Sequence, residues 1–226
     1  MNVYFLVEGK TERKIYPQWI NYLAPELQRV KTPSDVNKNN YFLISGNGYP
    51  SILDFLVDSV EDINNLACFD YLVLAIDTDD QSANEKVAEI ELFIKENNIH
   101  LGQCQLKIIP QTVCMETWFL ANRKIYTRVP PNAECAFYSQ HYDVSKHDPE
   151  LMKKPENRIE TTANFHHNYL KMMLKIKNIS YSKANPAEVG QLHYIDELKK
   201  RLKSDPESLR TMNHLFGFFE HVQQNI

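Results

Sequence analysis

The stretch Val3–Lys14, VYFLVEGKTERK, decides the fold. Its first five residues form an apolar run of the length expected for a buried β-strand, and the run ends at Glu8. The residues from Thr11 onward follow a helical pattern. Glu8 therefore lies directly after a buried strand and directly before a glycine. This is the position where open α/β sheets place their ligand-binding groups. Glu12 follows one helical turn later, so both carboxylates are expected to face the same space.

A second buried strand that ends in acidic residues lies at Tyr71–Asp80, YLVLAIDTDD. Asp77 and Asp79 are two residues apart, a spacing that puts both side chains on one side of an extended segment. An alternative is that these acids cap the helix expected to follow, because carboxylates favour helix N-termini. Two acidic strand ends in one sheet favour the first interpretation, which is a shared site for divalent metal.

The alternation of strand-like and helix-like segments predicts the fold class. The expected elements are strands at 2–7, 41–45, 71–76 and 105–109, and helices at 11–23, 50–64, 82–97 and 116–121. They predict an α/β fold with a mostly parallel four-stranded sheet flanked by helices. Right-handed crossovers then bring the carboxyl ends of the strands to one edge. The turn Gly46–Gly48, with Asn47 at its centre, is expected at the same edge.

The second part of the chain has a different character. Residues 123–155 are rich in Pro, Tyr and His and predict an irregular segment. Further helices are expected at 160–177, 186–203 and 206–224. We therefore expect a domain at 1–122 and a region at 123–226 that is first irregular, then helical, and packs on that domain.

Composition excludes several protein classes. Of the 226 residues, 43% are hydrophobic and 24% are charged, which predicts a packed core and argues against disorder. No apolar run approaches the roughly 18–20 residues that span a bilayer, and the first run lacks the basic residues of a signal peptide. The four cysteines have no metal-ligand spacing, which predicts reduced thiols. We expect a cytoplasmic protein that does not bind a membrane.

Charge is distributed unevenly along the chain. Residues 1–150 contain 13 Lys and Arg against 21 Asp and Glu, whereas residues 151–226 contain 12 against 8. An acidic part that could bind metal therefore lies next to a basic part that could bind phosphate. The alternative for the basic residues is a solvated helical surface without a ligand.

Carboxylates at rigid strand ends favour hard cations such as Mg²⁺, which prefers carboxylate oxygens together with water and substrate phosphate. Two such ions about 3.5–4 Å apart can activate a water and stabilise the leaving oxygen of a phosphodiester.

The segment Gly9-Lys10-Thr11 looks like the end of a P-loop, but that loop requires a glycine at position 4, which is Tyr. His166 and His167 could bind metal or act as a general base, but adjacent residues of a helix point apart, so a surface histidine pair is the favoured interpretation. His141 and His147 are weaker candidates for substrate contact.

Two motifs, VEGKTE at 7–12 and IDTDD at 76–80, resemble those of a TOPRIM domain. Together with METWFL at 115–120, they are more similar to the OLD-like and RloB-like TOPRIM nucleases of phage-defence systems. The first motif of those proteins carries a second Glu four residues after the first, as Glu12 follows Glu8 here. The resemblance covers about residues 1–122 and implies a TOPRIM-like catalytic domain there.

The resemblance implies roles for six residues. One metal ion would be bound by Glu8, Asp77 and Asp79, a second site would be completed by Glu12 and Glu116, and the transition-state charge would be stabilised by Lys183. The alternative for Lys183 is an ordinary surface lysine. Gln81 occupies the position of a third acid in some TOPRIM enzymes, so topoisomerase-like or primase-like metal use is not expected.

Together, the carboxylates and the resemblance predict a Mg²⁺- or Mn²⁺-dependent endonuclease that acts by a two-metal mechanism in anti-phage defence. Its substrate would be DNA or RNA, tRNA included, held by the basic C-terminal helices. The resemblance also implies a separately encoded ABC- or OLD-type ATPase as partner, and the chain would be a monomer or a homo-oligomer. Two alternatives stay open. One is a non-catalytic nucleic-acid-binding or regulatory subunit of an ATPase complex, and the other is a phosphotransferase-like enzyme acting on small phosphate esters.

Overall fold

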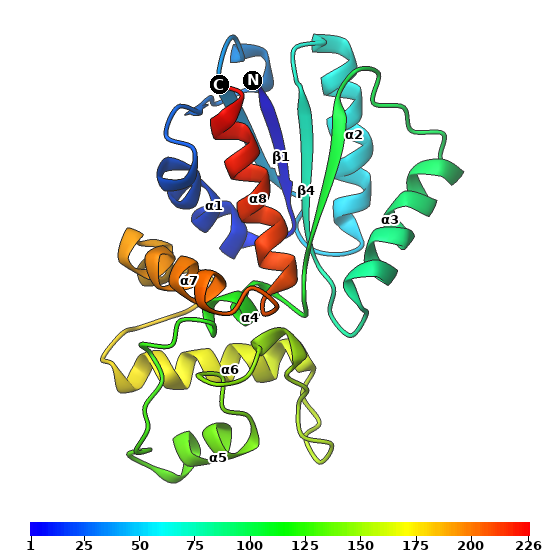
Figure 1. The fold of residues 1–226 in the computed structure, drawn as a ribbon. Coiled ribbons are helices and arrows are strands. Elements are labelled where there is room, and N and C mark those ends of the chain that lie inside the picture. Colours follow the sequence, from blue (N-terminus) through cyan, green and yellow to red (C-terminus); the bar gives the residue numbers. More distant parts are fainter.

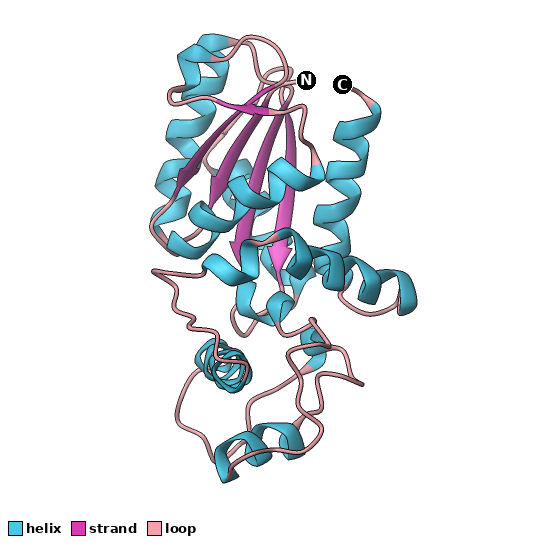
Figure 2. Cartoon of the chain, turned by 90° about the vertical axis from the view of Figure 1, so that its left-hand side faces the viewer, coloured by secondary structure: helices cyan, strands magenta, loops and turns pink.

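The computed structural model describes residues 1–226, apart from the side chain of Ala187. Across these residues, five strands form one parallel sheet in the order β2-β3-β1-β4-β5, with helices on both faces (Figure 1, Figure 2). The strands are β1 (Val3–Val7), β2 (Gln28–Arg29), β3 (Asn40–Ser45), β4 (Tyr71–Asp77) and β5 (Gln105–Gln111). The predicted α/β class is confirmed, but the predicted number of strands is wrong. The prediction missed β2 because its two exposed residues carry no hydrophobic pattern.

Helices and short 3₁₀ segments make up most of the remaining chain. They are α1 (Lys10–Leu23), η1 (Pro33–Asp35), α2 (Ser51–Leu66), α3 (Ala83–Glu96), α4 (Met115–Phe119), α5 (Ala133–His141), η2 (Pro149–Leu151), α6 (Thr162–Ile176), η3 (Ala187–Gly190), α7 (Leu192–Ser204) and α8 (Arg210–Gln224). Helix α5 lies within the segment predicted to be irregular, so that prediction is wrong in part. The side chain of Asn132 caps α5, and Tyr138 stacks on Tyr169 of α6, which stabilises a helix without a clear amphipathic pattern.

The two faces of the sheet are covered by different helices. Side chains alternate along β1, so Phe5 enters one core together with α1 and α8, whereas Tyr4 enters a second core together with α2 and α3. Phe5 stacks on Phe219 of α8, with ring centroids 6.2 Å apart. Helix α8, from the end of the chain, therefore lies beside α1 on the same face of the sheet (Figure 1).

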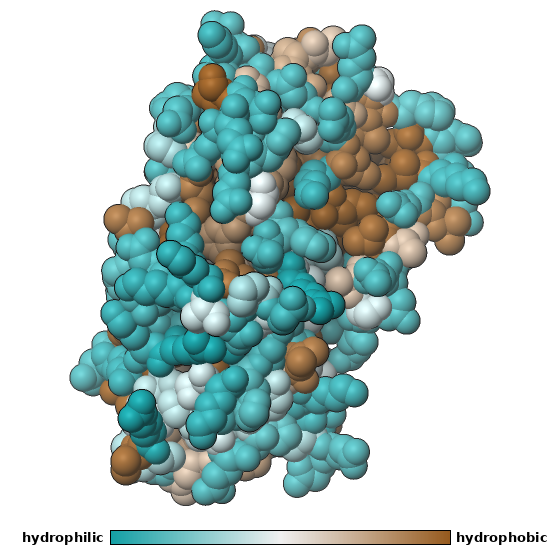
Figure 3. All heavy atoms as spheres, viewed as in Figure 1, coloured by the Kyte–Doolittle hydropathy of each residue, from teal (hydrophilic) through white to brown (hydrophobic). Residues whose placement is uncertain are grey.

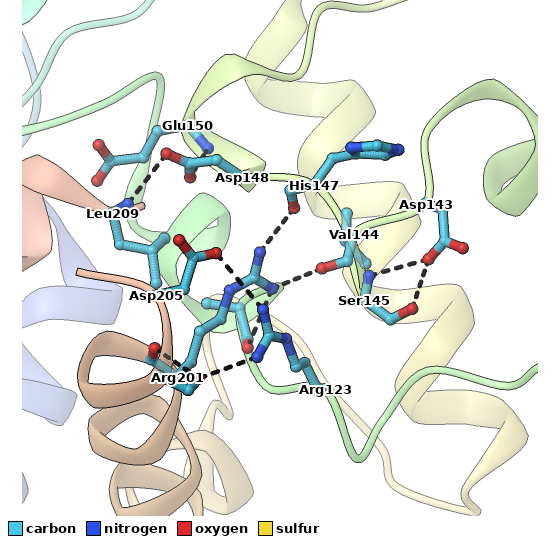
Figure 4. A network of polar contacts seen from close by, with 12 residues as sticks. Arg123, Asp143, Val144, Ser145, His147, Asp148, Glu150, Arg201, Asp205 and Leu209 are labelled. Carbon is cyan, nitrogen blue, oxygen red and sulfur yellow. Dashed lines mark hydrogen bonds and ion pairs between the residues drawn. The ribbon is translucent and has the colours of Figure 1, made fainter. Parts of the chain in front are cut away.

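Arg201 of α7 joins the C-terminal region to the end of the first part of the chain (Figure 4). Its guanidinium is buried and donates hydrogen bonds to the carbonyls of Ala121, Val144 and His147, at 3.4, 2.5 and 2.7 Å. One side chain of α7 thus joins two segments that are distant from it in sequence, one at Ala121 and one at 144–147. Burial lowers the pKa of Arg201 to about 10, which still leaves the group charged near neutral pH.

Three further features of the fold concern membrane-spanning helices, an exposed hydrophobic surface and the cysteines. None of the helices in the described part of the chain combines the length and hydrophobicity needed to cross a lipid bilayer. Hydrophobic side chains do gather over the space between β5 and α3 (Figure 3), where Ile94, Leu106 and Ile108 are only partly buried. The cysteines are all free, and three of them are buried.

Candidate active site

The carboxyl ends of the strands meet at the lower edge of the sheet in Figure 2, and Glu8 lies there, directly after β1. Because β1 pairs in parallel with β4, the residue after β1 lies beside the end of β4. Glu8 Oε2 accepts a hydrogen bond of 2.9 Å from the backbone N–H of Asp77. The pairing of two adjacent strands therefore fixes the carboxylate of Glu8.

Glu12 lies in the first turn of α1 and is only 4% exposed. Its carboxylate is folded back against Gly9, the N-cap residue of the helix. A Cβ atom at position 9 would lie 2.9 Å from Glu12 Oε2, closer than van der Waals contact allows. The glycine therefore gives Glu12 the room to turn toward Glu8.

Asp77 is the last residue of β4, and its Oδ1 atom is buried. Within the described part of the chain, that oxygen has no hydrogen-bond partner. Two residues later the chain has left the extended conformation, since Asp79 has a φ of 51° and is exposed. The expectation that Asp77 and Asp79 share one side of an extended segment is therefore wrong.

The acids after β4 do not cap the next helix either. The N-cap residue of α3 is Ser82, whose hydroxyl accepts a hydrogen bond from the Glu85 N–H, while the Glu85 carboxylate accepts one from the Ser82 N–H. This reciprocal pair satisfies the free N–H groups of the first turn. The alternative role considered for Asp77 and Asp79 is thus filled by other residues.

A cavity of about 470 Å³ opens at this edge of the sheet. It is lined by Glu8, Gly9, Lys10, Thr11, Glu12, Asn47, Gly48, Asp77 and Lys183. Three of the predicted metal ligands and the predicted lysine therefore share one cavity, and Asn47 lies at its wall. Asp79 and Glu116 do not line it.

The three carboxylates of the cavity resist ionisation. Burial, followed by the charges of Glu116 and Glu8, raises the pKa of Glu12 to about 7. Burial and the charges of Glu12 and Glu8 raise the pKa of Asp77 well above its usual range. Burial also raises the pKa of Glu8, and the nearby charge of Asp79 adds to the effect. Carboxylates crowded in this way favour a bound cation, which would relieve their mutual repulsion.

Glu116, in α4, has a different environment, although it is only 1% exposed. Its Oε1 accepts hydrogen bonds from the Tyr181 hydroxyl at 2.9 Å and from His167 Nδ1 at 3.1 Å. Its Oε2 lies 3.9 Å from Lys183 Nζ. Burial alone would raise the pKa of Glu116, but His167 and Lys183 hold it below the usual value. Glu116 is thus a carboxylate that already has partners.

His167 and Tyr181 are the site residues that sequence reasoning missed. His166 and His167 were expected to form a surface pair, and this is wrong, because both face α4. His166 is fully buried between Thr117 Oγ1 at 2.7 Å and the Met152 carbonyl at 3.0 Å. No motif in the sequence pairs α6 with α4, so only the tertiary fold identifies the contact between His167 and Glu116.

Lys183 reaches the cavity from a tight turn in which Ser182 and Asn185 form an isolated bridge. Lys14 of α1 donates a hydrogen bond to the carbonyl of Ala184, which ties this turn to the helix that carries Glu12. Burial lowers the pKa of Lys183, but the surrounding negative charges, of which that of Glu116 has the largest effect, together outweigh burial and raise the pKa. The side chain is still 55% exposed, so Lys183 lies between the acidic group and solvent.

The two remaining histidine candidates have structural contacts. His141 Nε2 lies 2.7 Å from the Lys153 carbonyl, and the His147 carbonyl accepts a bond from Arg201. The residues lining the cavity fit a hard cation by their chemistry, because they supply carboxylate oxygens and include the unpartnered Oδ1 of Asp77. Within the described residues, however, no three His, Cys, Asp or Glu side chains are already arranged to hold a metal ion.

Comparison with known proteins finds no family model, no curated protein and no solved structure that matches this chain. The likeness to TOPRIM nucleases therefore rests on the three short motifs.

Proposed function

We propose that the protein is a divalent-metal-dependent nuclease that hydrolyses phosphodiester bonds of DNA or RNA at this cavity. The observation that carries the proposal is the convergence of Glu8, Glu12 and Asp77, from separate segments, on one cavity with Lys183 at its mouth. Three crowded acids are poor ligands for a phosphate by themselves, since they repel it. With a bound cation, the same group becomes a site that attracts phosphate.

Glu8, Glu12 and Asp77 would hold Mg²⁺ or Mn²⁺ through their carboxylate oxygens. Asp79 and Glu116 do not line the cavity, but the charge of Asp79 reaches Glu8 and that of Glu116 reaches Glu12, so these are the further carboxylates that we propose for a second ion. The bound ions would supply Lewis acidity, which lowers the pKa of a bound water and neutralises charge on the phosphate.

The residues of the chain have separate tasks in this proposal. Hydrolysis forms a bond from the water oxygen to phosphorus and breaks the bond to the leaving sugar oxygen, while one proton leaves the water and one reaches the leaving oxygen. Lys183 would stabilise the extra negative charge on the phosphoryl oxygens. Glu116 would position Lys183, and Tyr181 and His167 would hold Glu116 in turn.

The resemblance extends the proposal beyond the cavity. It suggests that the nuclease is an effector of anti-phage defence and works with a separately encoded ABC- or OLD-type ATPase. One observation favours an alternative, which is a non-catalytic nucleic-acid-binding or regulatory subunit. In the described residues, the acids are not already arranged around a metal position. A phosphotransferase-like enzyme acting on small esters would use the same carboxylates. These candidates differ in what the protein cleaves.

The experiment is a cleavage assay with Mn²⁺ or Mg²⁺ on single-stranded and duplex DNA, on tRNA and on a small aryl phosphate. Wild type is compared with Glu8→Ala and with Glu91→Ala, a control at an exposed position of α3. Cleavage of nucleic acid that is lost in Glu8→Ala and kept in the control supports the proposal, provided both variants melt like wild type. Turnover of the small ester alone would favour the phosphotransferase. No cleavage at all, even with a candidate ATPase added, would favour the regulatory subunit.

A further inference from the structure

Helix α6 contacts two acidic residues next to the cavity, Asp80 and Glu116, although none of its own residues lines that cavity. At its start, the Thr162 hydroxyl donates a hydrogen bond of 2.8 Å to Asp80, in the loop that follows β4. One and a half turns later, His167 bonds to Glu116. The helix therefore runs across the carboxyl edge of the sheet, below the strand ends in Figure 1.

The outer face of α6 carries exposed basic and amide side chains. Asn164, Asn168, Lys171 and Lys175 follow the three- and four-residue spacing that places them on one face, and all four are exposed. In the part of the chain that the structure describes, neither lysine side chain makes a hydrogen bond or an ion pair. Four residues of helix rise about 6 Å, so Lys171 lies about 6 Å beyond His167 along the helix and Lys175 about 12 Å beyond it.

These lysines border a hollow between α5 and α6 with a volume of about 390 Å³. Arg158 lies on its other side, with its guanidinium 4.6 Å from the centre of the Phe137 ring. Glu134 is the one acid among the residues that line it, and Glu160 pairs with Arg158 at 3.8 Å. Three cations and the carboxylate of Glu134 thus line the hollow, and a second carboxylate lies beside it, since Glu160 also accepts a hydrogen bond of 2.8 Å from Asn168.

We propose that this basic hollow binds the phosphodiester backbone of the nucleic-acid substrate, which continues along α6 to the acidic cavity. The inference rests on the proposed function, since it names the surface that holds the substrate of the same site. A strand approaching Glu8, Glu12 and Asp77 meets negative charge, so cations outside the cavity are needed to hold it. The guanidinium of Arg158 supplies directed hydrogen-bond donors, and the two lysines supply mobile charge.

The test is binding without cleavage. A fluorescently labelled single-stranded DNA of about 20 nucleotides, its duplex and a tRNA are titrated with protein in a chelator, and fluorescence anisotropy is followed from about 50 to 200 mM salt. The variant Lys171→Glu/Lys175→Glu is compared with Lys31→Glu/Lys38→Glu, which changes the net charge equally. Lys31 and Lys38 are exposed in the loop between β2 and β3, at the opposite edge of the sheet.

We expect the α6 variant to bind at least roughly tenfold more weakly. For a single strand, the slope of log affinity against log salt should become shallower by about 1.4, which corresponds to two lost phosphate contacts. The control should bind like wild type. Equal weakening in both variants, or wild type that binds none of the three probes, overturns the inference. If only the α6 variant binds more weakly and the protein cleaves no substrate, the basic hollow still binds nucleic acid but the proposed nuclease activity is wrong. The two proposals can therefore fail separately.

Discussion

The backbone N–H of Asp77 donates a hydrogen bond of 2.9 Å to Glu8 Oε2, so the end of β4 orients the carboxylate at the end of β1. The bond needs an oxygen acceptor at position 8, but it does not need a charge. A glutamine there would keep the acceptor and remove the charge. The structural role of Glu8 can therefore be separated from the metal binding that we propose for it.

Glu8→Gln is expected to fold like wild type and to bind Mn²⁺ about 10–100-fold more weakly, because a charged ligand is lost while the hydrogen bond remains. The measurement is the melting temperature with and without Mn²⁺, since a ligand that binds only the native state stabilises it. Glu91→Gln, on the exposed face of α3, is the control. If Mn²⁺ raises the melting temperature of Glu8→Gln as much as that of wild type, Glu8 is not a metal ligand.

Glu12→Gln should stabilise the metal-free protein. The pKa of Glu12 is raised to about 7, above its unfolded value, because burial and neighbouring acids disfavour the charged form. The stability that comes with protonation is present at low pH and is lost as the pH rises from about 4.5 through 7. Near pH 8 the buried charge should therefore cost on the order of 3 kcal/mol, which glutamine avoids.

Urea unfolding in a chelator measures this effect. The gain of Glu12→Gln over wild type should be largest near pH 8 and smaller near pH 5. Glu26→Gln, at an exposed position just after α1, should give no gain at either pH. Destabilisation by Glu12→Gln at both pH values would mean that Glu12 has a cationic partner in solution.

Gly9→Ala should impair metal binding through Glu12. The added Cβ would lie 2.9 Å from Glu12 Oε2, so the carboxylate has to move out of its place beside Glu8. We expect roughly tenfold weaker Mn²⁺ binding by calorimetry, with little change in melting temperature. Gly217→Ala in α8 is the matched control, because its Cβ would meet no atom within 4 Å. Equal Mn²⁺ affinity in both variants would show that metal binding does not depend on the present place of the Glu12 carboxylate.

Much of the sheet and part of the site could be predicted from local pattern. Buried parallel strands are nearly continuous apolar runs, so β1 and β4 are visible in the sequence, and the residue after each run must lie at the ligand-binding edge. That rule brings Glu8 and Asp77 together without any knowledge of the helices. Lys183 came from the resemblance, and the structure places it in the same cavity.

The rest of the site depends on contacts between distant segments. The prediction for Asp79 assumed that the chain stays extended after β4, whereas the φ of 51° turns it away. His167 contacts Glu116 only because α6 packs on α4. Tyr181 also bonds to Glu116, and it lies at the start of the turn that Lys14 of α1 holds through the carbonyl of Ala184. Helix α5 is stabilised by aromatic contacts with α6, which hydrophobic periodicity does not register.

Arg201 should be irreplaceable even by lysine. Its Nη1 donates to the carbonyls of Ala121 and Val144, and its Nη2 donates to that of His147 (Figure 4). A lysine presents one nitrogen on a flexible stem and cannot reproduce this planar fork, so buried carbonyls lose their donors. Because Arg201 is only 1% exposed, Arg201→Lys is expected to cost about 2–4 kcal/mol in urea unfolding. The same change at Arg210, an exposed residue paired with Glu207 at 2.8 Å, should cost less than about 0.5 kcal/mol. Equal stability of the two variants would show that the three carbonyls find other donors, and that the C-terminal region is held without this guanidinium.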